Sequence, residues 1–277
     1  MWVQFPILLC ILASICACTP ERPSPETPVP ETLRVVSLSP SNTELLHAIG
    51  AQELMVGRTS YCDYPTSTQD IPSIGSLFPP DFERILSVRP NLVVMSNGNT
   101  KVRDRLRRLN IPVIVIHPKT VDDIADSMRR LGVAVGYETR AEHAAQAFEK
   151  RLMQLSKKGQ GAISVLYEVA SKPMRIPGQT TFLADLIRHA GGIPIGHADQ
   201  GDWPMVNREW VLTRNPDVML VTEQKRIKAL NHPTHPLRNL SAVKAGTVYV
   251  VPDPDLFVRP GPRVLDAIRW LINTLKP

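Results

Sequence analysis

A phrase of 15 residues occurs twice in this chain of 277 residues, and it limits the folds that the sequence allows. It reads DFERILSVRPNLVVM at residues 81–95 and NREWVLTRNPDVMLV at residues 207–221. Each copy has a helical pattern that ends before a proline, followed by a short apolar run typical of a buried strand. Either the likeness arose by chance, or the chain contains two α/β lobes of related design.

Three identities align the two copies most clearly. Proline ends each helix because it pushes the preceding residue out of the α region. Neither helix capping nor core packing requires a glutamate 7 residues before that proline in both copies, so the two glutamates are candidate functional residues. The identical pairs are Glu83 with Glu209, Leu86 with Leu212, and Pro90 with Pro216.

Short apolar runs alternate with helical patterns along the rest of the chain. Continuous apolar runs of this kind predict parallel strands that helices cover on both faces. The segment Ser41-Asn42-Thr43-Glu44 predicts a capping box at the start of a helix. We expect strands at residues 34–38, 54–57, 92–95, 113–116, 163–169, 217–222 and 247–252, and further helices at residues 81–89, 101–109, 120–136, 180–190, 207–215 and 262–275.

The segment from residue 139 to residue 158 has a helical pattern without glycine or proline. A helix of this length spans roughly 30 Å, which is the size of a small domain. We therefore expect an α/β fold with an N-terminal lobe (33–138), a linking helix (139–158) and a C-terminal lobe (159–277). Clefts between two such lobes are common sites for small ligands.

The first 18 residues form an apolar run that predicts a targeting segment. Its end, Ile15-Cys16-Ala17-Cys18, resembles a bacterial lipobox, in which Cys18 would be lipidated after cleavage. A plain signal peptide or an uncleaved anchor is the alternative. Residues 19–32 contain 5 prolines and predict an extended tether. We expect a protein of the periplasm or the cell surface, anchored to a membrane by lipid.

Charge and cysteine usage restrict the partners of the folded body. A net charge of +6 and a pI near 9.3 raise nucleic acid as a partner. However, the most basic stretch, Lys101 to Leu109, alternates with apolar residues at helical spacing and has no aromatic residues, which predicts a solvated helix face. We expect no nucleic-acid partner. Cys62 is the one cysteine after residue 18, so we expect it to be a buried structural residue.

Catalytic and metal sites have little support in the sequence. The chain has no G-x-S-x-G, G-x-x-x-x-G-K-[ST] or G-x-G-x-x-G motif, so we expect no enzyme activity. His197, His232 and His235 form a loose group of possible metal ligands, so binding of a transition metal ion stays as a minor alternative.

Several segments resemble the helical-backbone periplasmic binding proteins of ABC importers, and in particular their vitamin B12 (cobalamin) binding branch. They are RVVSLSPSNTELLHAIGA, TSYCDYP, IPSIG, RPNLVV, TFLADLIRHAGG, NPDVMLV, AVKAGTVYVVPD and RPGPRVLDAI. The resemblance covers residues 33–276 in order. It implies a class III fold of two Rossmann-like lobes joined by one long helix, with the ligand held between the lobes and no resident cofactor.

The same resemblance implies a membrane permease dimer with a cytoplasmic ATPase as the partner. In that family, one surface glutamate on each lobe docks into arginine pockets of the permease. The matching residues here are Glu83 and Glu209. Equivalent glutamates on two lobes suit a receptor with two-fold symmetry.

The ligand-binding positions are also implied by the resemblance. Two positions depart from it, because Leu77 and Ser96 stand where vitamin B12 binders have tryptophans. Ferric siderophores and haem are therefore alternative ligands. The matching residues are Ser60, Tyr61, Leu77, Phe78, Ser96, Trp203, Asp255, Phe257 and Arg259.

Overall fold

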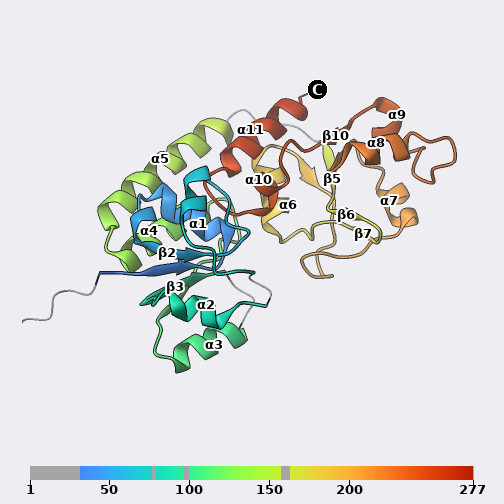
Figure 1. Cartoon of the computed structure of the whole chain (residues 1–277). Helices are drawn as coiled ribbons and strands as arrows, with labels where there is room; N and C mark the ends of the chain where they lie inside the picture. The colour runs from blue at the N-terminus through green and yellow to red at the C-terminus, as the bar shows by residue number, and fades with distance from the viewer. Residues whose placement is uncertain (1–31, 77–78, 97–99, 157–162, 277) are drawn as a thin grey trace, which may run out of the picture. The chain divides into compact units, whose positions relative to one another are not determined.

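The structure, a computed structural model, describes residues 32–76, 79–96, 100–156 and 163–276. The predicted leader and all but the last residue of the tether lie outside the described residues. Two parallel sheets of four strands organise the described chain (Figure 1). The first sheet contains β1 (Val35–Ser37), β2 (Met55–Arg58), β3 (Leu92–Met95) and β4 (Val113–Val115), and the second contains β5 (Ser164–Glu168), β8 (Ile193–Pro194), β9 (Val218–Val221) and β10 (Val248–Val250).

The two sheets have the same topology. Their strand orders are β2-β1-β3-β4 and β10-β9-β5-β8. When the strands of each sheet are numbered along the chain, the first order is second, first, third, fourth, and the second order is the same when it is read from β8 to β10. The α/β fold with two related lobes is therefore confirmed, and the repeated phrase supplies the third strand of each sheet.

Side chains alternate between the two faces of each sheet, as the strand period requires. In the first lobe, Val35 joins the large central core and Val36 joins an outer cluster. In the second lobe, Val165 and Leu166 divide in the same way. The central core draws residues from both lobes and from the helices α1 (Pro40–Ala48), α4 (Asp123–Val135), α6 (Phe182–His189) and α11 (Val264–Thr274).

The outer faces of the sheets are covered by other helices. In the first lobe, α2 (Phe82–Ser87) and α3 (Thr100–Arg108) contribute Ile85, Val102 and Leu106 to the outer cluster. In the second lobe, α7 (Arg208–Arg214), α8 (Gln224–Leu230) and α9 (Ser241–Ala245) cover the outer face. Each sheet is therefore buried on both sides, which explains the apolar runs in its strands.

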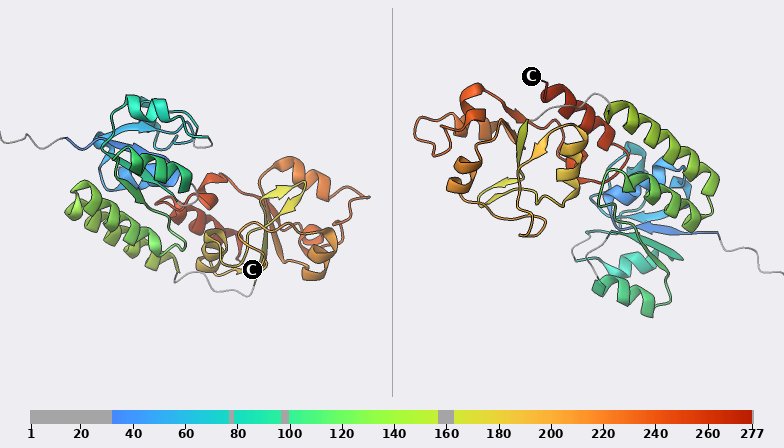
Figure 2. Two further views of the ribbon diagram at one scale, coloured as in Figure 1. Left: turned by 90° about the horizontal axis from the view of Figure 1, so that it is seen from below. Right: turned by 180° about the vertical axis from the view of Figure 1, so that it is seen from behind.

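The predicted long helix is α5 (Glu138–Ser156), which packs against α4 and α11 (Figure 2). Residues 157 and 158 of the predicted helix lie outside the described residues. Helices α4 and α5 approach each other closely at Gly132, where an added Cβ would collide with the Cβ of Ala141. Glycine is needed at this crossing because no larger side chain fits.

Short elements were not predicted from the sequence. They include the hairpin of β6 (Ala170–Ser171) and β7 (Met174–Arg175) and the helix α10 (Asp255–Val258). The 3-10 helices η1 (Gln52–Leu54) and η2 (Thr66–Asp70) were also missed. None of these is long enough to show a hydrophobic period.

The predicted capping box at Ser41 to Glu44 is wrong. Helix α1 begins at Pro40, and its N-cap is Ser39. Proline suits the first helical position, because its missing N–H would have no partner there. The Glu44 carboxylate instead binds the Arg263 guanidinium at 2.7 and 3.0 Å.

The two copies of the phrase match at the start of their helices. The Asp81 side chain accepts a hydrogen bond from the Arg84 backbone N–H at 3.1 Å. The Asn207 side chain accepts the equivalent bond from Trp210 at 2.8 Å. Both helices therefore have a side-chain N-cap at the same position of the phrase.

The copies also match where the helix gives way to the strand. The residues before the prolines, Arg89 and Asn215, both have positive φ, at 44° and 40°. The residue after each proline binds, through its side chain, a backbone N–H at the start of the neighbouring strand. Asn91 accepts the Arg34 N–H at 2.6 Å, and Asp217 accepts the Ser164 N–H at 2.8 Å. We call these two contacts the strand staples.

Removing either strand staple should destabilise its lobe. We expect Asn91→Ala and Asp217→Ala each to lower the free energy of unfolding by about 1 kcal/mol. Hydrogen bonds from the Ser164 side chain and backbone lower the pKa of Asp217. The Asp217 contribution is therefore present above about pH 4, the range of an unfolded aspartate, and is lost as pH falls through the lower folded pKa.

Urea denaturation at pH 7 and pH 3 checks both parts of this prediction. The loss of unfolding free energy caused by Asp217→Ala should be smaller at pH 3 than at pH 7. The loss caused by Asn91→Ala should be the same at both, because an amide does not titrate. Lys150→Ala, an exposed change on α5, serves as the control with little effect. Penalties no larger than the control would contradict the role of the strand staples.

Candidate functional site

The carboxyl ends of the first lobe's strands bring polar side chains to one edge of its sheet. Ser39 follows β1, and Tyr61 lies soon after β2. Ser96 directly follows β3, and His117 lies just after β4. In open parallel α/β sheets, ligands bind outside the carboxyl ends of the strands. This edge is therefore the expected place for a ligand site.

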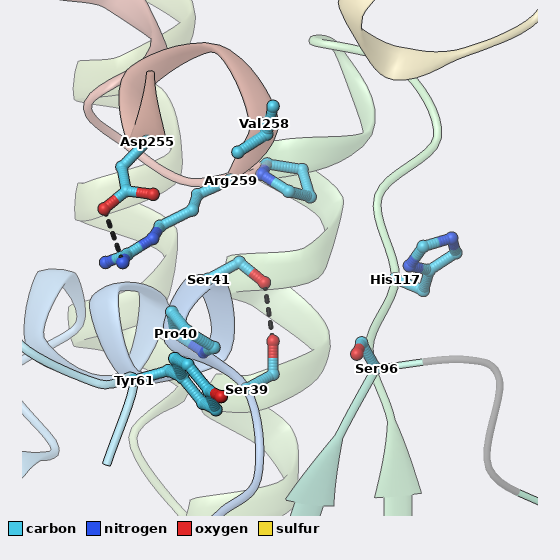
Figure 3. Close-up of a pocket in the computed structure, with 10 residues that line it drawn as sticks. Ser39, Pro40, Ser41, Tyr61, Ser96, His117, Asp255, Val258 and Arg259 are labelled. Carbon is cyan, nitrogen blue, oxygen red and sulfur yellow. Dashed lines mark hydrogen bonds and ion pairs between the residues drawn. The ribbon is translucent and has the colours of Figure 1, made fainter. Parts of the chain in front are cut away.

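A short helix of the second lobe closes a cavity of about 450 Å³ over this edge. Helix α10 contributes Asp255 and Val258, and Arg259 and Pro260 follow it. Figure 3 shows the carboxylate of Asp255 against the guanidinium of Arg259, above the start of α1. The described lining residues are Ser39, Pro40, Ser41, Tyr61, Ser96, His117, Asp255, Val258, Arg259 and Pro260.

A second cavity of about 440 Å³ adjoins the first. The two share His117, Val258 and Pro260 as lining residues. The second also has walls from both lobes, and we call the two cavities together the cleft. Its other described lining residues are Pro118, Lys119, Thr180, Thr181, Phe182, Asp202 and Trp203.

The loop that carries Trp203 is fixed to the second lobe by backbone contacts. The Arg175 guanidinium donates a hydrogen bond to the Trp203 carbonyl at 2.8 Å. The Gly178 N–H donates to the Asp202 carbonyl at 2.9 Å. An added Cβ at Gly178 would collide with the carbonyl oxygen of Gly201, so glycine permits this close approach. Trp203 is 42% exposed at the end of this supported loop.

The Arg259 guanidinium in the cleft already has acidic partners. It lies 2.6 Å from the Asp255 carboxylate and 2.6 Å from the Asp63 carboxylate. A third carboxylate, that of Glu44, is 3.7 Å away. The Arg259 side chain is only 12% exposed. Arg259 therefore has little capacity to pair with a further anion.

These contacts keep Arg259 and Asp63 charged. Burial alone would lower the pKa of Arg259, but the hydrogen bond to Asp63 and the charges of the carboxylates outweigh burial and raise the pKa. The hydrogen bond from Arg259 likewise lowers the pKa of Asp63.

Beneath Arg259, a second arginine joins the two lobes. The Arg263 guanidinium binds both carboxylate oxygens of Glu44 and lies 3.3 Å from the Asp253 carboxylate. Its guanidinium also stacks 4.0 Å from the centre of the Tyr64 ring. Burial raises the pKa of Glu44, and the two arginines oppose that rise. We call Glu44, Asp63, Asp253, Asp255, Arg259 and Arg263 the inter-lobe charge cluster.

The structure brings several of the predicted ligand-binding residues together. Tyr61, Ser96, Asp255 and Arg259 line the first cavity, and Trp203 lines the second. Ser60 is exposed beside Tyr61 but lines neither cavity. Leu77 and Phe78 lie outside the described residues, so their predicted role stays a prediction.

The prediction that Phe257 contacts the ligand is wrong for this structure. Its side chain has an exposed fraction of 0% and belongs to the central core. Its ring centre lies 5.7 Å from that of Tyr167 and 5.7 Å from that of Trp270. Because α10 turns one face to the core and another to the cleft, Val258 lines the cavity instead.

Several cleft residues were missed by the sequence reasoning. Ser39, His117 and Lys119 lie at the carboxyl ends of predicted strands, so the strand-end rule would have found them. Val258 and Pro260 gave no signal, because their position depends on the short helix α10. Glu44 was assigned to helix capping instead of the inter-lobe charge cluster.

The three histidines proposed as metal ligands have other surroundings. His197 stacks on Trp210 with ring centres 4.6 Å apart, and the His235 ring lies 3.3 Å from the Arg226 guanidinium. Among the described residues, no group of three or more histidine, cysteine or acidic side chains could hold a metal ion. The Cys62 thiol is buried and lies 3.2 Å from the Thr59 hydroxyl.

None of the helices in the described parts of the chain is long and apolar enough to cross a membrane. The leader predicted from the sequence falls outside those parts.

Curated relatives resemble almost the whole chain. The vitamin B12-binding protein of Pectobacterium carotovorum is 28% identical over 274 residues, covering 96% of this chain and 94% of the relative. An uncharacterised ABC transporter substrate-binding lipoprotein of Bacillus subtilis is 27% identical over 260 residues, covering 89% of this chain and 81% of the relative.

Solved structures resemble it as well. The periplasmic vitamin B12 binding protein of Vibrio cholerae has a TM-score of 0.78 at 27% identity, covering 87% of this chain and 96% of that one. The periplasmic haem-binding protein of the same organism has a TM-score of 0.77 at 19% identity, covering 89% and 100%, and this likeness concerns the fold alone.

The family model for periplasmic binding proteins matches residues 35–254, which contain both sheets and the long helix. Proteins of this family serve transport and are not an enzyme class. Their ligands are small molecules, and their partners are a permease and its ATPase. The chain therefore belongs to the periplasmic binding protein family, as an ABC transporter substrate-binding protein of the cobalamin, siderophore and haem group.

Proposed function

We propose that this protein captures a corrinoid, a cobalamin-like molecule, in the cleft and delivers it to a membrane permease. Two kinds of observation support this ligand. Relatives and a solved structure that resemble nearly the whole chain are named as vitamin B12-binding proteins. The cleft lies at the carboxyl ends of the first lobe's strands and has walls from both lobes, which suits a large ligand.

The observation that carries this choice is the state of Arg259. Its guanidinium already contacts the carboxylates of Asp255 and Asp63 at 2.6 Å each. A free arginine would favour ligand carboxylates, such as the propionates of haem. An arginine whose charge is already balanced by carboxylates disfavours such ligands and suits the neutral amide fringe of a corrinoid, whose amide groups both donate and accept hydrogen bonds.

Aromatic residues supply flat surfaces for the macrocycle. Tyr61 is 57% exposed and Trp203 is 42% exposed, and each lines a different cavity of the cleft. Exposed aromatic side chains in monomers often mark recognition sites, since burial of a ring contributes strongly to binding. We assign stacking to these rings, and amide contacts to Ser96 and Asp255.

Tryptophan fluorescence tests the ligand. We expect cobalamin and cobinamide to quench the emission of the purified protein in a saturable way, and Trp203→Phe to remove most of the quenching. Trp210→Phe is the matched control, because Trp210 stacks on His197 and lines neither cavity of the cleft. Saturable binding of haem or ferric siderophores without corrinoid binding would overturn the choice of ligand.

For delivery, we assign permease docking to the matched faces of α2 and α7. Glu83 and Glu209 are both exposed. One turn further along, Leu86 is 39% exposed and Leu212 is 38% exposed. Residues three apart on a helix share a face, so each lobe presents a glutamate beside a leucine. Figure 1 shows α2 on the first lobe and α7 on the second. Such a repeated surface suits a permease dimer with two equivalent half-sites.

The double variant Glu83→Ala with Glu209→Ala tests docking. Corrinoid affinity should not change, because both residues lie away from the lining of the cleft. Uptake by cells should fall by at least about tenfold, because a charge-assisted hydrogen bond contributes roughly 1.5–3 kcal/mol. The exposed pair Glu138→Ala with Glu223→Ala is the control. Normal uptake by the first double variant would exclude this docking mode.

We also propose that Cys18 carries the lipid anchor. The Bacillus subtilis relative is named as a lipoprotein, and the sequence before Cys18 resembles a lipobox. In cell fractionation, Cys18→Ala should release the protein from the membrane fraction, whereas Cys16→Ala should leave it there. Membrane association that survives the loss of Cys18 would favour an uncleaved anchor.

A further inference from the structure

His117 occupies the place where the two cavities of the cleft meet. It lies just after β4 and lines both cavities. The residue is exposed. In Figure 3 its ring stands apart from the other labelled side chains, and no dashed line reaches it. A ligand that fills both cavities would therefore pass beside this imidazole.

The His117 imidazole has no partner among the described residues, since no hydrogen bond or ion pair there involves it. Several other histidines in the described chain have polar partners. The His47 ring lies 2.8 Å from the Thr68 hydroxyl, and the His189 ring lies 3.5 Å from the Asp185 carboxylate. His235 is held near Arg226. A nitrogen lone pair of His117 is therefore available to a ligand.

The donor set of the cleft fits one kind of metal. A bare transition metal ion needs three or four protein ligands, and no group of three is present in the described chain. A metal inside a macrocycle already has its equatorial ligands and needs only an axial one. Imidazole is a good donor for such metals. The two charged lining groups of the first cavity, Asp255 and Arg259, are paired with each other.

We propose that His117 supplies an axial nitrogen ligand to the cobalt of a corrinoid bound in the cleft. This inference rests on the proposed function and adds a bond that the proposed function does not require. In the step, the imidazole lone pair forms a Co–N bond and the water that occupied the axial position leaves to solvent. The cobalt does not change its oxidation state, and neutral imidazole needs no proton transfer.

Absorption spectroscopy with aquocobinamide tests the inference, because this corrinoid lacks the nucleotide base that would compete for the axial position. On binding to the unaltered protein, the visible bands should shift from those of the aquo form to those of an imidazole complex. His117→Ala should bind with the aquo spectrum and about tenfold more weakly or worse. His232→Ala, which removes an exposed histidine that lines neither cavity of the cleft, should keep the imidazole spectrum.

Free imidazole provides a second test, which does not depend on whether the variant folds as the unaltered protein does. Added to the complex of His117→Ala with aquocobinamide, it should restore the shifted bands at concentrations too low to convert unbound aquocobinamide. An aquo spectrum in the unaltered complex, or a shift that survives His117→Ala, would overturn the inference and leave corrinoid binding intact. Failure of cobalamin and cobinamide to bind would overturn the proposed function, and the inference with it.

Discussion

The buried pairing of Glu44 with Arg263 is the contact on which the cleft depends. Glu44 lies on α1 and Arg263 lies just before α11, the first and the last helix of the described residues, yet both carboxylate oxygens bind the guanidinium, at 2.7 and 3.0 Å. The exposed fractions of these side chains are 2% and 16%. Losing one partner of a buried pair costs about 3–5 kcal/mol, because the other charge is left without compensation. The pairing therefore fixes the segment that closes the cleft.

The charge of the cleft depends on this fixed segment, because the segment also carries Arg259. Arg259, four residues before Arg263, lies between carboxylates of both lobes, which hold its guanidinium and balance its charge. The cleft therefore contains an arginine that keeps the lobes together and does not recruit an anion. A ligand must be recognised by ring stacking, by hydrogen bonds to neutral groups and, as we infer, by one bond to its metal.

The sequence predicted the regular parts of this molecule better than its site. The strand of residues 92–95 and the two lobes could be predicted because apolar period and proline position are local signals. Phe257 and Glu44 were misassigned because an aromatic residue or a glutamate has the same local pattern whether it faces a core, a cap or a distant arginine. The place of His117 at the sheet edge could be predicted, because it directly follows a predicted strand. Its position between two cavities could not, because the meeting of two lobes far apart in sequence sets it.

The central claim is that the cleft selects against negative charge because its arginine is already paired. Calorimetry with cobalamin and with a derivative in which one side-chain amide is hydrolysed to a carboxylate tests it directly. The two ligands have nearly the same shape and differ in charge. We expect the acid to bind about tenfold more weakly or worse. Asp255→Asn should reduce this difference in affinity between the two ligands. Equal or tighter binding of the acid by the unaltered protein would contradict the account.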